Sequence, residues 1–218
     1  TIRPWPFPHL YFENVFPDEF YLQLQDAMPK FQAFDQIAKI RNVRSSDGSV
    51  PYKDRFVISF NDDVTHLQPP WKTFQNILGG KNIGMALLEK FEPYLTKRLT
   101  EGEEVVSDAL LIRDRGNYSL GPHTDHPLRL VILIIYLPLT DAEPHLGTSL
   151  YVPKEDGFTC AGGPHYEHQM FHRVFTAPYK PNSALVFVKT NNSFHGVEPV
   201  AEGEVRNLFH FFIKKVND

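Results

Sequence analysis

Two stretches of the sequence, Gly121-Pro-His-Thr-Asp-His126 and Ser193-Phe-His-Gly-Val197, decide how the chain must fold, because their polar side chains form one ligand set. His123 and Asp125 are separated by a single residue, so on an extended strand both side chains project to the same side and can bind one ion. The third ligand, His195, must arrive from a distant strand. The pattern therefore predicts a β-rich domain in which separate strands meet at a metal site.

The ligand types indicate which metal this is. Two neutral imidazoles and one carboxylate on one face of a divalent ion leave the opposite face open, an arrangement typical of non-haem Fe(II) oxygenases. A His-x-Asp sequence alone occurs often by chance, and a histidine such as His195 is by default an ordinary half-buried strand residue. Their combination in one β-rich chain favours an iron site formed by His123, Asp125 and His195.

Length and composition indicate one domain. The chain has 218 residues, of which 42% are hydrophobic, which is enough to bury a core as a single domain over residues 1–218. The formal net charge is −4 and the pI is about 6.2, and the lysines and arginines are scattered along the chain. Because a protein that follows a phosphate backbone needs a basic stripe, we expect no nucleic-acid partner.

Cysteine content and hydropathy bear on the compartment. Cys160 is the only cysteine, so an internal disulfide and any cysteine-based zinc or iron–sulfur site are excluded, which fits a reducing cytoplasm. The first residues lack the pattern of a signal peptide. The longest apolar run, 128–139, is interrupted by Arg129 and is shorter than the roughly 20 residues that span a bilayer. We therefore expect a cytoplasmic protein without a membrane partner, and a buried strand over this run.

Helical periodicity is confined to the first half of the chain. Pro17-Asp-Glu-Phe20 is typical of a helix start, and it is followed by apolar Leu24 and Met28. Further helices are expected over 71–78 and 83–99, the latter kinked or divided at Pro93. From about Val105, short segments bounded by Gly, Pro and Asn predict strands over 105–113, 130–137, 148–152, 173–177, 184–189 and 205–213.

Helices followed by strands predict an α+β chain whose β part is a two-sheet jelly roll, or double-stranded β-helix of cupin-like type. We expect residues 1–104 to be mainly a helical support layer on one outer face, and residues 105–218 to be the jelly-roll core. The Gly- and His-rich segment 141–172 has little periodicity, so we expect a long loop that overhangs the site.

At this point the sequence resembles a known family, the Fe(II)- and 2-oxoglutarate-dependent oxygenases with a double-stranded β-helix. The shared pattern is His-x-Asp, a distant histidine and then a basic residue, here Arg206. Tyr136-Leu-Pro is similar to a Tyr-Leu-x element of the branch that contains the prolyl 4-hydroxylases, and Phe7-Pro-His is similar to the start of many such domains. The resemblance covers roughly residues 5–215.

The resemblance implies a cosubstrate and a reaction. Fe(II) would be held by His123, Asp125 and His195, 2-oxoglutarate would take two of the three remaining positions, and O2 would take the last. Arg206 would bind the far carboxylate of 2-oxoglutarate through paired hydrogen bonds, and Tyr136 would add a phenolic donor. Oxidative decarboxylation would then drive hydroxylation of the substrate. Related halogenases lack the carboxylate ligand, so Asp125 disfavours halogenation, whereas desaturation stays open.

Candidate substrate residues lie beside these motifs. His126 follows the carboxylate ligand, and Arg115, Tyr118 and Asn191 are further candidates. Arg113 and Arg115 could equally form salt bridges with neighbours such as Asp114. For His165 and His168 a structural or substrate-side role is favoured over a second metal site, because no carboxylate or cysteine lies at zinc-site spacing.

The substrate class and two other functions stay open. A free amino acid, a peptidyl side chain or another small metabolite would each suit the chemistry, since fold and cofactor do not define the molecule oxidised. The first alternative function is a cupin-type metalloenzyme that does not use 2-oxoglutarate. The second is a non-catalytic, metal-bound jelly-roll binding module. The sequence gives no indication of oligomeric state.

Overall fold

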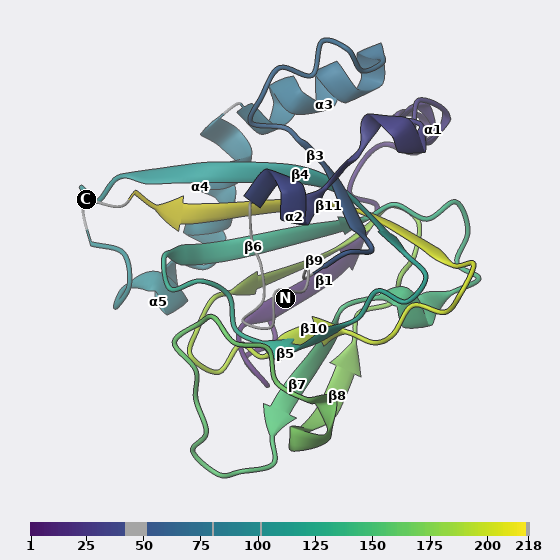
Figure 1. The fold of residues 1–218 in the computed structure, drawn as a ribbon. Helices are drawn as coiled ribbons and strands as arrows, with labels where there is room; N and C mark the ends of the chain where they lie inside the picture. The colour runs from purple at the N-terminus through teal and green to yellow at the C-terminus, as the bar shows by residue number, and fades with distance from the viewer. Residues whose placement is uncertain (42–51, 80, 101, 217–218) are drawn as a thin grey trace.

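Two antiparallel β-sheets form the framework of the computed structural model, which describes residues 1–41, 52–79, 81–100 and 102–216 (Figure 1). The larger sheet has seven strands in the order β1-β9-β6-β11-β4-β3-β2, and the smaller has four in the order β5-β10-β7-β8. With helices on the outer face of the larger sheet, this is the α+β jelly roll that the sequence predicts.

All six predicted strands are present in this arrangement. They are β4 (Val105–Arg115), β6 (Arg129–Tyr136), β7 (Ser149–Pro153), β8 (Phe171–Thr176), β9 (Ser183–Val188) and β11 (Val205–Lys215). The run expected to be a buried strand is β6, in which every residue after Arg129 is buried.

The sequence also placed His123 and His195 on strands, without giving bounds for them. Altogether, five further strands lie outside the six predicted ranges. They are β1 (His9–Glu13), β2 (Asp35–Gln36), β3 (Arg55–Ser59), β5 (Leu120–His123) and β10 (His195–Val197). The first three come from the region expected to be mainly helical, and they extend the larger sheet at its two sides. These five strands have two to five residues each and show too little alternation to be delimited in this sequence, so their bounds become clear only from their pairing with neighbouring strands.

Five helices accompany the larger sheet in the described part of the chain: four cover its face that points away from the smaller sheet, and one, which begins at Ile37, adjoins the space between the two sheets (Figure 1). They are α1 (Asp18–Asp26), α2 (Ile37–Arg41), α3 (Pro69–Gly79), α4 (Lys81–Lys90) and α5 (Glu92–Leu95), with a 3-10 turn over Phe31–Ala33. Pro93 lies in the first turn of α5, where a missing N–H leaves no hydrogen bond unmade, so the expected division is confirmed. No helix in the described ranges is long and apolar enough to cross a membrane.

Strand β11 separates two buried layers because its side chains alternate between the faces of the sheet. Phe209 and Phe211 pack among the helices, where the Phe209 ring lies 4.6 Å from that of Phe74. Leu208 and Phe212 point the other way, into the space between the two sheets. This inner space also receives the side chain of Arg206, so the strand that closes the helical core also lines the site.

The segment 141–172 is not one long loop. It contains 3-10 turns over Pro144–Leu146 and His168–Met170, and strand β7 lies between them. The part around Gly162 does lie over the ligand-bearing turn: a Cβ at Gly162 would come within 2.4 Å of the Asp125 carbonyl oxygen. The expected overhang is therefore present, but it is built by a short piece of the segment.

Candidate metal centre

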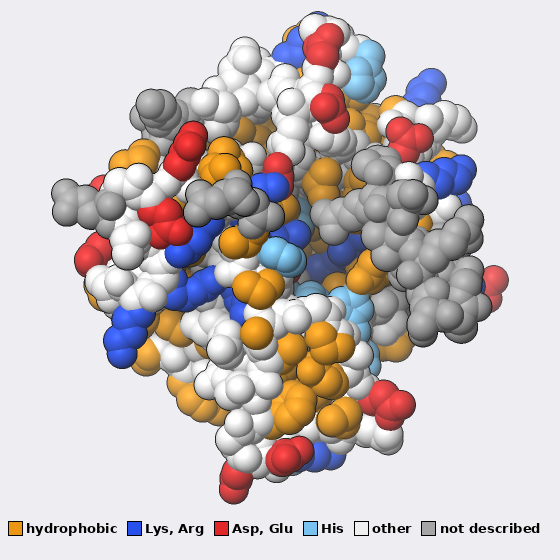
Figure 2. Space-filling model, turned by 60° about the vertical axis from the view of Figure 1, so that its left-hand side comes forward, with side chains coloured by type: hydrophobic (Ala, Val, Ile, Leu, Met, Phe, Trp, Pro, Cys, Tyr) orange, Lys and Arg blue, Asp and Glu red, His pale blue; other side chains and the backbone are white. Residues whose placement is uncertain are grey.

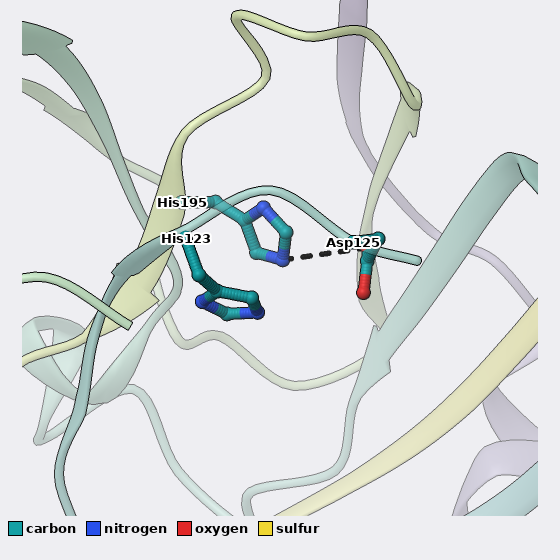
Figure 3. Close-up of side chains that lie close together, drawn as sticks. All are labelled: His123, Asp125 and His195. Carbon is teal, nitrogen blue, oxygen red and sulfur yellow. Dashed lines mark ion pairs between the residues drawn. The ribbon is translucent and has the colours of Figure 1, made fainter. Parts of the chain in front are cut away.

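The three predicted metal ligands converge at one end of the smaller sheet (Figure 3). His123 is the last residue of β5 and His195 the first of β10, and the two face each other directly in the antiparallel pair. Asp125 lies beyond the end of β5, so the expectation that both residues of His-x-Asp share one strand is wrong. The strand ends at His123, and the ligand atoms of all three residues still lie within 4.8 Å of one another.

Backbone carbonyls fix the orientation of both imidazoles. The Nδ1 atom of His123 lies 3.0 Å from the Gly121 oxygen, and Nδ1 of His195 lies 3.0 Å from the Ser193 oxygen. A carbonyl can only accept, so each Nδ1 carries the proton and each Nε2 keeps a free lone pair. Such hydrogen bonds to the remote nitrogen are what orients metal-bound histidines.

Burial and charge keep this set in the form that binds a cation. Burial, together with the other positive groups, lowers the pKa of His123 and of His195, so both rings are neutral near pH 7. Burial opposes ionisation of Asp125, but the Arg129 guanidinium and the neighbouring His195 and His123 together outweigh it and hold the pKa of that carboxyl below its usual range. The Oδ2 atom of Asp125 is buried without a hydrogen-bond partner among the described residues. A divalent metal ion would satisfy this atom and both Nε2 lone pairs, so the donor set fits Fe(II).

Arg129 supports the carboxylate ligand from the start of β6. Its guanidinium carbon lies 3.8 Å from the centre of the Phe212 ring. The guanidinium donates a hydrogen bond to Asp125 Oδ1, so only Oδ2 of that carboxylate lacks a partner among the described residues. This leaves Oδ2 turned toward His195 Nε2, which is 3.6 Å away. The sequence analysis did not assign Arg129 to the site, although its position four residues after Asp125 was a usable signal.

A cavity of about 520 Å³ opens between the two sheets beside these ligands. Figure 2 shows the face on which it opens, where histidine and basic side chains gather around a hollow. Apolar residues from the larger sheet form much of its wall: Leu110, Ile112, Ile134 and Leu208. The ligands, Arg206 and Thr148 also line it. The cavity is therefore a partly apolar chamber with the metal-ligand set at one side and polar groups at defined positions.

Arg206 lines this cavity, and Tyr136, which is fully buried and is not one of the lining residues, contacts the same neighbour, Thr148. Arg206 is 1% exposed and donates from Nε to the Leu146 oxygen at 2.5 Å and from Nη2 to Thr148 Oγ1 at 3.2 Å. Tyr136 accepts a hydrogen bond from the Thr148 N–H at 3.1 Å. Both residues thus adjoin Thr148, and the structure brings the two predicted cosubstrate residues together.

A row of alternating charge crosses three strands of the larger sheet. Arg206 on β11, Asp114 on β4 and Arg55 on β3 are directly opposite one another in the strand register. Asp114 is fully buried and accepts from Arg55 Nε at 2.7 Å, Arg55 Nη2 at 2.8 Å and Arg206 Nη1 at 2.8 Å. One carboxylate therefore serves two guanidinium groups. The salt bridge considered between Asp114 and Arg113 or Arg115 is not formed.

Two of the four predicted substrate residues lie near the cavity. His126 is exposed and lines it. Tyr118 is buried below Arg55, whose guanidinium carbon lies 4.3 Å from the ring centre, and the Tyr118 hydroxyl has no hydrogen-bond partner among the described residues. Arg115 lies over the Phe31 ring and borders a separate depression, and Asn191 is exposed away from the cavity lining.

The cavity is also lined by Tyr52 and His210, which the sequence analysis did not assign to the site, and by His165, for which it expected a structural or substrate-side role. The Tyr52 hydroxyl lies 3.2 Å from His165 Nε2, and the His165 ring is 4.6 Å from that of His123. This contact joins the segment before β3 to the overhanging segment. His210 of β11 lines the wall as well. Neither Tyr52 nor His210 belongs to a local motif, because their positions at the cavity depend on contacts between distant segments.

Prolyl hydroxylases share this fold. A prolyl hydroxylase from Trichoplax adhaerens, in complex with a hypoxia inducible factor oxygen degradation domain peptide fragment, aligns with a TM-score of 0.58 and 14% identity over 94% of this chain and 83% of that one. A Pseudomonas putida prolyl-4-hydroxylase aligns with a TM-score of 0.51 and 13% identity, over 96% of this chain and 93% of that one. A prolyl 4-hydroxylase from Phytophthora capsici aligns with a TM-score of 0.56 and 14% identity, over 95% of this chain and 59% of that one.

The comparisons by sequence give no match to a family model or to a curated protein. The structural likeness, at 13–14% identity, establishes a common fold. The resemblance noted in the sequence is therefore confirmed at the level of fold.

Proposed function

We propose that the protein is an Fe(II)- and 2-oxoglutarate-dependent dioxygenase that hydroxylates an amino acid, a peptidyl side chain or a small metabolite. The observation that carries this proposal is the buried His123, Asp125 and His195 set, whose Asp125 Oδ2 atom has no protein partner within the described residues. The cavity beside it also holds a buried arginine suited to a dicarboxylate. The fold shared with prolyl hydroxylases supports the same class.

The three ligands would hold Fe(II) through two Nε2 atoms and one carboxylate oxygen. When bound, Fe(II) supplies the redox chemistry with O2 that couples decarboxylation of 2-oxoglutarate, giving succinate and CO2, to hydroxylation of a C–H bond. The protein contributes a rigid pair of imidazoles, because both Nδ1 protons are held by backbone carbonyls, and burial keeps both rings neutral. Arg129 keeps the carboxylate ionised and directs one oxygen toward the ion.

Arg206 would bind the far carboxylate of 2-oxoglutarate. Three of its five N–H donors are used by Leu146, Asp114 and Thr148, so two remain for an anion. Those three contacts hold the planar guanidinium in one orientation, which favours a paired interaction with a carboxylate. The Tyr136 hydroxyl accepts from the Thr148 amide and still has its own proton to donate. Its proposed role is to give that proton to the same carboxylate.

The apolar wall of the cavity would exclude water from the reacting atoms. Ile134, Leu120 and Leu208 line the chamber together with the ligands and Arg206. A low-polarity enclosure strengthens the charge interactions inside it and limits loss of reactive species to solvent. The Trichoplax prolyl hydroxylase was solved with a peptide fragment, so a peptidyl substrate is one of the candidates for this chain.

The test is a titration of 2-oxoglutarate into Fe(II)-loaded protein under nitrogen. We expect a visible metal-to-ligand charge-transfer band in the wild type, no band in His123→Ala, and a weakened one in Arg206→Gln. Arg173→Gln, which alters a surface arginine paired with Glu198, is the matched control and should titrate like the wild type.

The outcomes separate the three functional classes. Absence of the band in the wild type, with iron bound, would favour a cupin-type enzyme that does not use 2-oxoglutarate. A band without any succinate formation, across a broad panel of amino acids, peptides and metabolites under O2, would favour the non-catalytic module. Succinate formation that is lost in His123→Ala would exclude that module.

A further inference from the structure

The described groups around the cavity carry more positive than negative charge. Three guanidinium groups, those of Arg55, Arg129 and Arg206, line it, and the two carboxylates that pair with them are Asp125 and Asp114. Three positive and two negative groups leave a net charge of +1. If the proposed function holds, Fe(II) and the 2-oxoglutarate dianion add +2 and −2, so the described groups of the loaded site keep this surplus of +1.

Of these three guanidinium groups, that of Arg55 is placed to bind an anionic ligand. It is on the edge side of the charged row, lines the cavity and keeps 13% of its side chain exposed. Asp114 takes two of its five N–H donors, and the other three have no partner among the described residues. Arg206, by contrast, is 1% exposed and is the residue proposed for the cosubstrate. A cation in a poorly solvated cavity is stabilised by an anion that reaches its unused donors.

The residues around Arg55 indicate which kind of ligand would fit beside it. Ile37 and Ile112 give an apolar wall beside it, and the Tyr52–His165 contact stands at the mouth. The ring of Tyr118 lies under the guanidinium, and its buried hydroxyl has no hydrogen-bond partner among the described residues. A molecule with an apolar body and one anionic end matches this wall.

The size of the surplus distinguishes two kinds of anion. A carboxylate brings a charge of −1 and would bring the site to neutrality. A phosphate monoester brings about −1.5 to −2 near pH 7 and would leave it negative. The planar guanidinium also pairs with a carboxylate through two parallel hydrogen bonds.

We propose that the primary substrate of this site carries a carboxylate, and that Arg55 binds this group. This inference rests on the proposed function and specifies its substrate class. Arg55 is thus a specificity-determining residue, separate from the metal ligands and from Arg206.

The test uses protein loaded with Zn(II), which does not react with O2, and saturated with 2-oxoglutarate. Binding is measured by calorimetry for matched pairs of compounds, in which each N-acetyl amino acid or short branched carboxylic acid is compared with its primary amide. We expect at least one carboxylate to bind about tenfold or more tightly than its amide in the wild type, since a charge-assisted pair is lost in the amide. In Arg55→Gln this ratio should fall to about one, and Arg55→Lys should retain part of it.

Controls keep the substrate inference apart from the proposed function. Arg173→Gln should keep the full preference for carboxylates, and the affinity of Arg55→Gln for 2-oxoglutarate should stay within about threefold of the wild type. Melting curves show whether each variant is folded, and Arg55→Lys keeps the charge if Arg55→Gln is unstable. Failure of 2-oxoglutarate to bind the wild type would refute the proposed function itself.

Three results would overturn the inference while leaving the proposed function intact. The first is a panel in which no carboxylate binds more tightly than its amide. The second is a carboxylate preference that survives in Arg55→Gln. The third is a loss of 2-oxoglutarate affinity in Arg55→Gln as large as the loss for the carboxylates, which would assign Arg55 to the cosubstrate.

Discussion

Replacing Asp114 with asparagine would remove the only negative charge in the row Arg55–Asp114–Arg206. The substitution preserves size and leaves one oxygen that can accept a hydrogen bond, so it creates no cavity. It leaves two guanidinium groups, one of them 1% exposed, with no counter-charge from strand β4. The expected result is a large loss of stability, because the charged donors stay buried when their partner is neutralised.

The magnitude follows from the contacts. Asp114 is fully buried and accepts three charge-assisted hydrogen bonds of 2.7–2.8 Å. Breaking a buried pair from one side costs about 3–5 kcal/mol, which is a large part of a typical total stability of about 5–15 kcal/mol. For a chain of this size each kcal/mol shifts the melting temperature by about 2–4 °C, so Asp114→Asn should lower it by about 6–20 °C.

Urea unfolding of the metal-free protein measures this cost, and Asp108→Asn is the matched control. Asp108 is on the same strand but 24% exposed, and it pairs with Lys214, so its loss should cost less than about 1 kcal/mol. In an Arg55→Gln background, Asp114→Asn should lower the free energy of unfolding by at least about 1 kcal/mol less than in the wild type, because only one of the two guanidinium groups then loses its counter-charge. A cost below about 1 kcal/mol, or full additivity of the two substitutions, would refute the view that this row is a coupled buried unit.

Three further substitutions test other parts of the structure. Burial lowers the pKa of Lys189 from 10.5 to about 8, so the folded state disfavours the charged amine. Lys189→Met should therefore raise the free energy of unfolding at pH 7. This gain should disappear between pH 8 and 10.5, because the amine loses its proton in the folded state at a lower pH than in the unfolded state. Exposed Lys180→Met should show no such gain in the same denaturation series. Gly162→Ala would place a Cβ 2.4 Å from the Asp125 carbonyl oxygen, at a backbone φ of +138°. Gly163→Ala is the matched control, because its φ is +120° but its Cβ would meet nothing within 4 Å. Calorimetry should show weaker Zn(II) binding for Gly162→Ala than for Gly163→Ala. Tyr136→Phe leaves a buried N–H without its acceptor and should cost about 1–3 kcal/mol in thermal unfolding, while an unchanged stability would show that water replaces the phenol.

The sequence predicts the long elements of this fold and misses the short ones, for a physical reason. Strand β6 is an uninterrupted buried run, and β11 is long enough to show its character from composition alone. Strands β5 and β10 have four and three residues, and they exist because each pairs with a neighbour that the local sequence does not specify. The convergence of His123, Asp125 and His195 was still predictable, since the residue types and the His-x-Asp spacing can be read from the sequence even where the strands cannot.

The remaining site residues depend on register, which no local pattern encodes. Arg55 and Arg206 share Asp114 only because three antiparallel strands place them opposite one another. A shift of one residue in β11 would turn Arg206 toward the helices and bring Phe209 or Phe211 into the cavity. The large apolar rings on the helical face therefore fix the register that holds a buried arginine beside the metal ligands. Packing that serves stability on one side of β11 determines the charge presented to a ligand on the other.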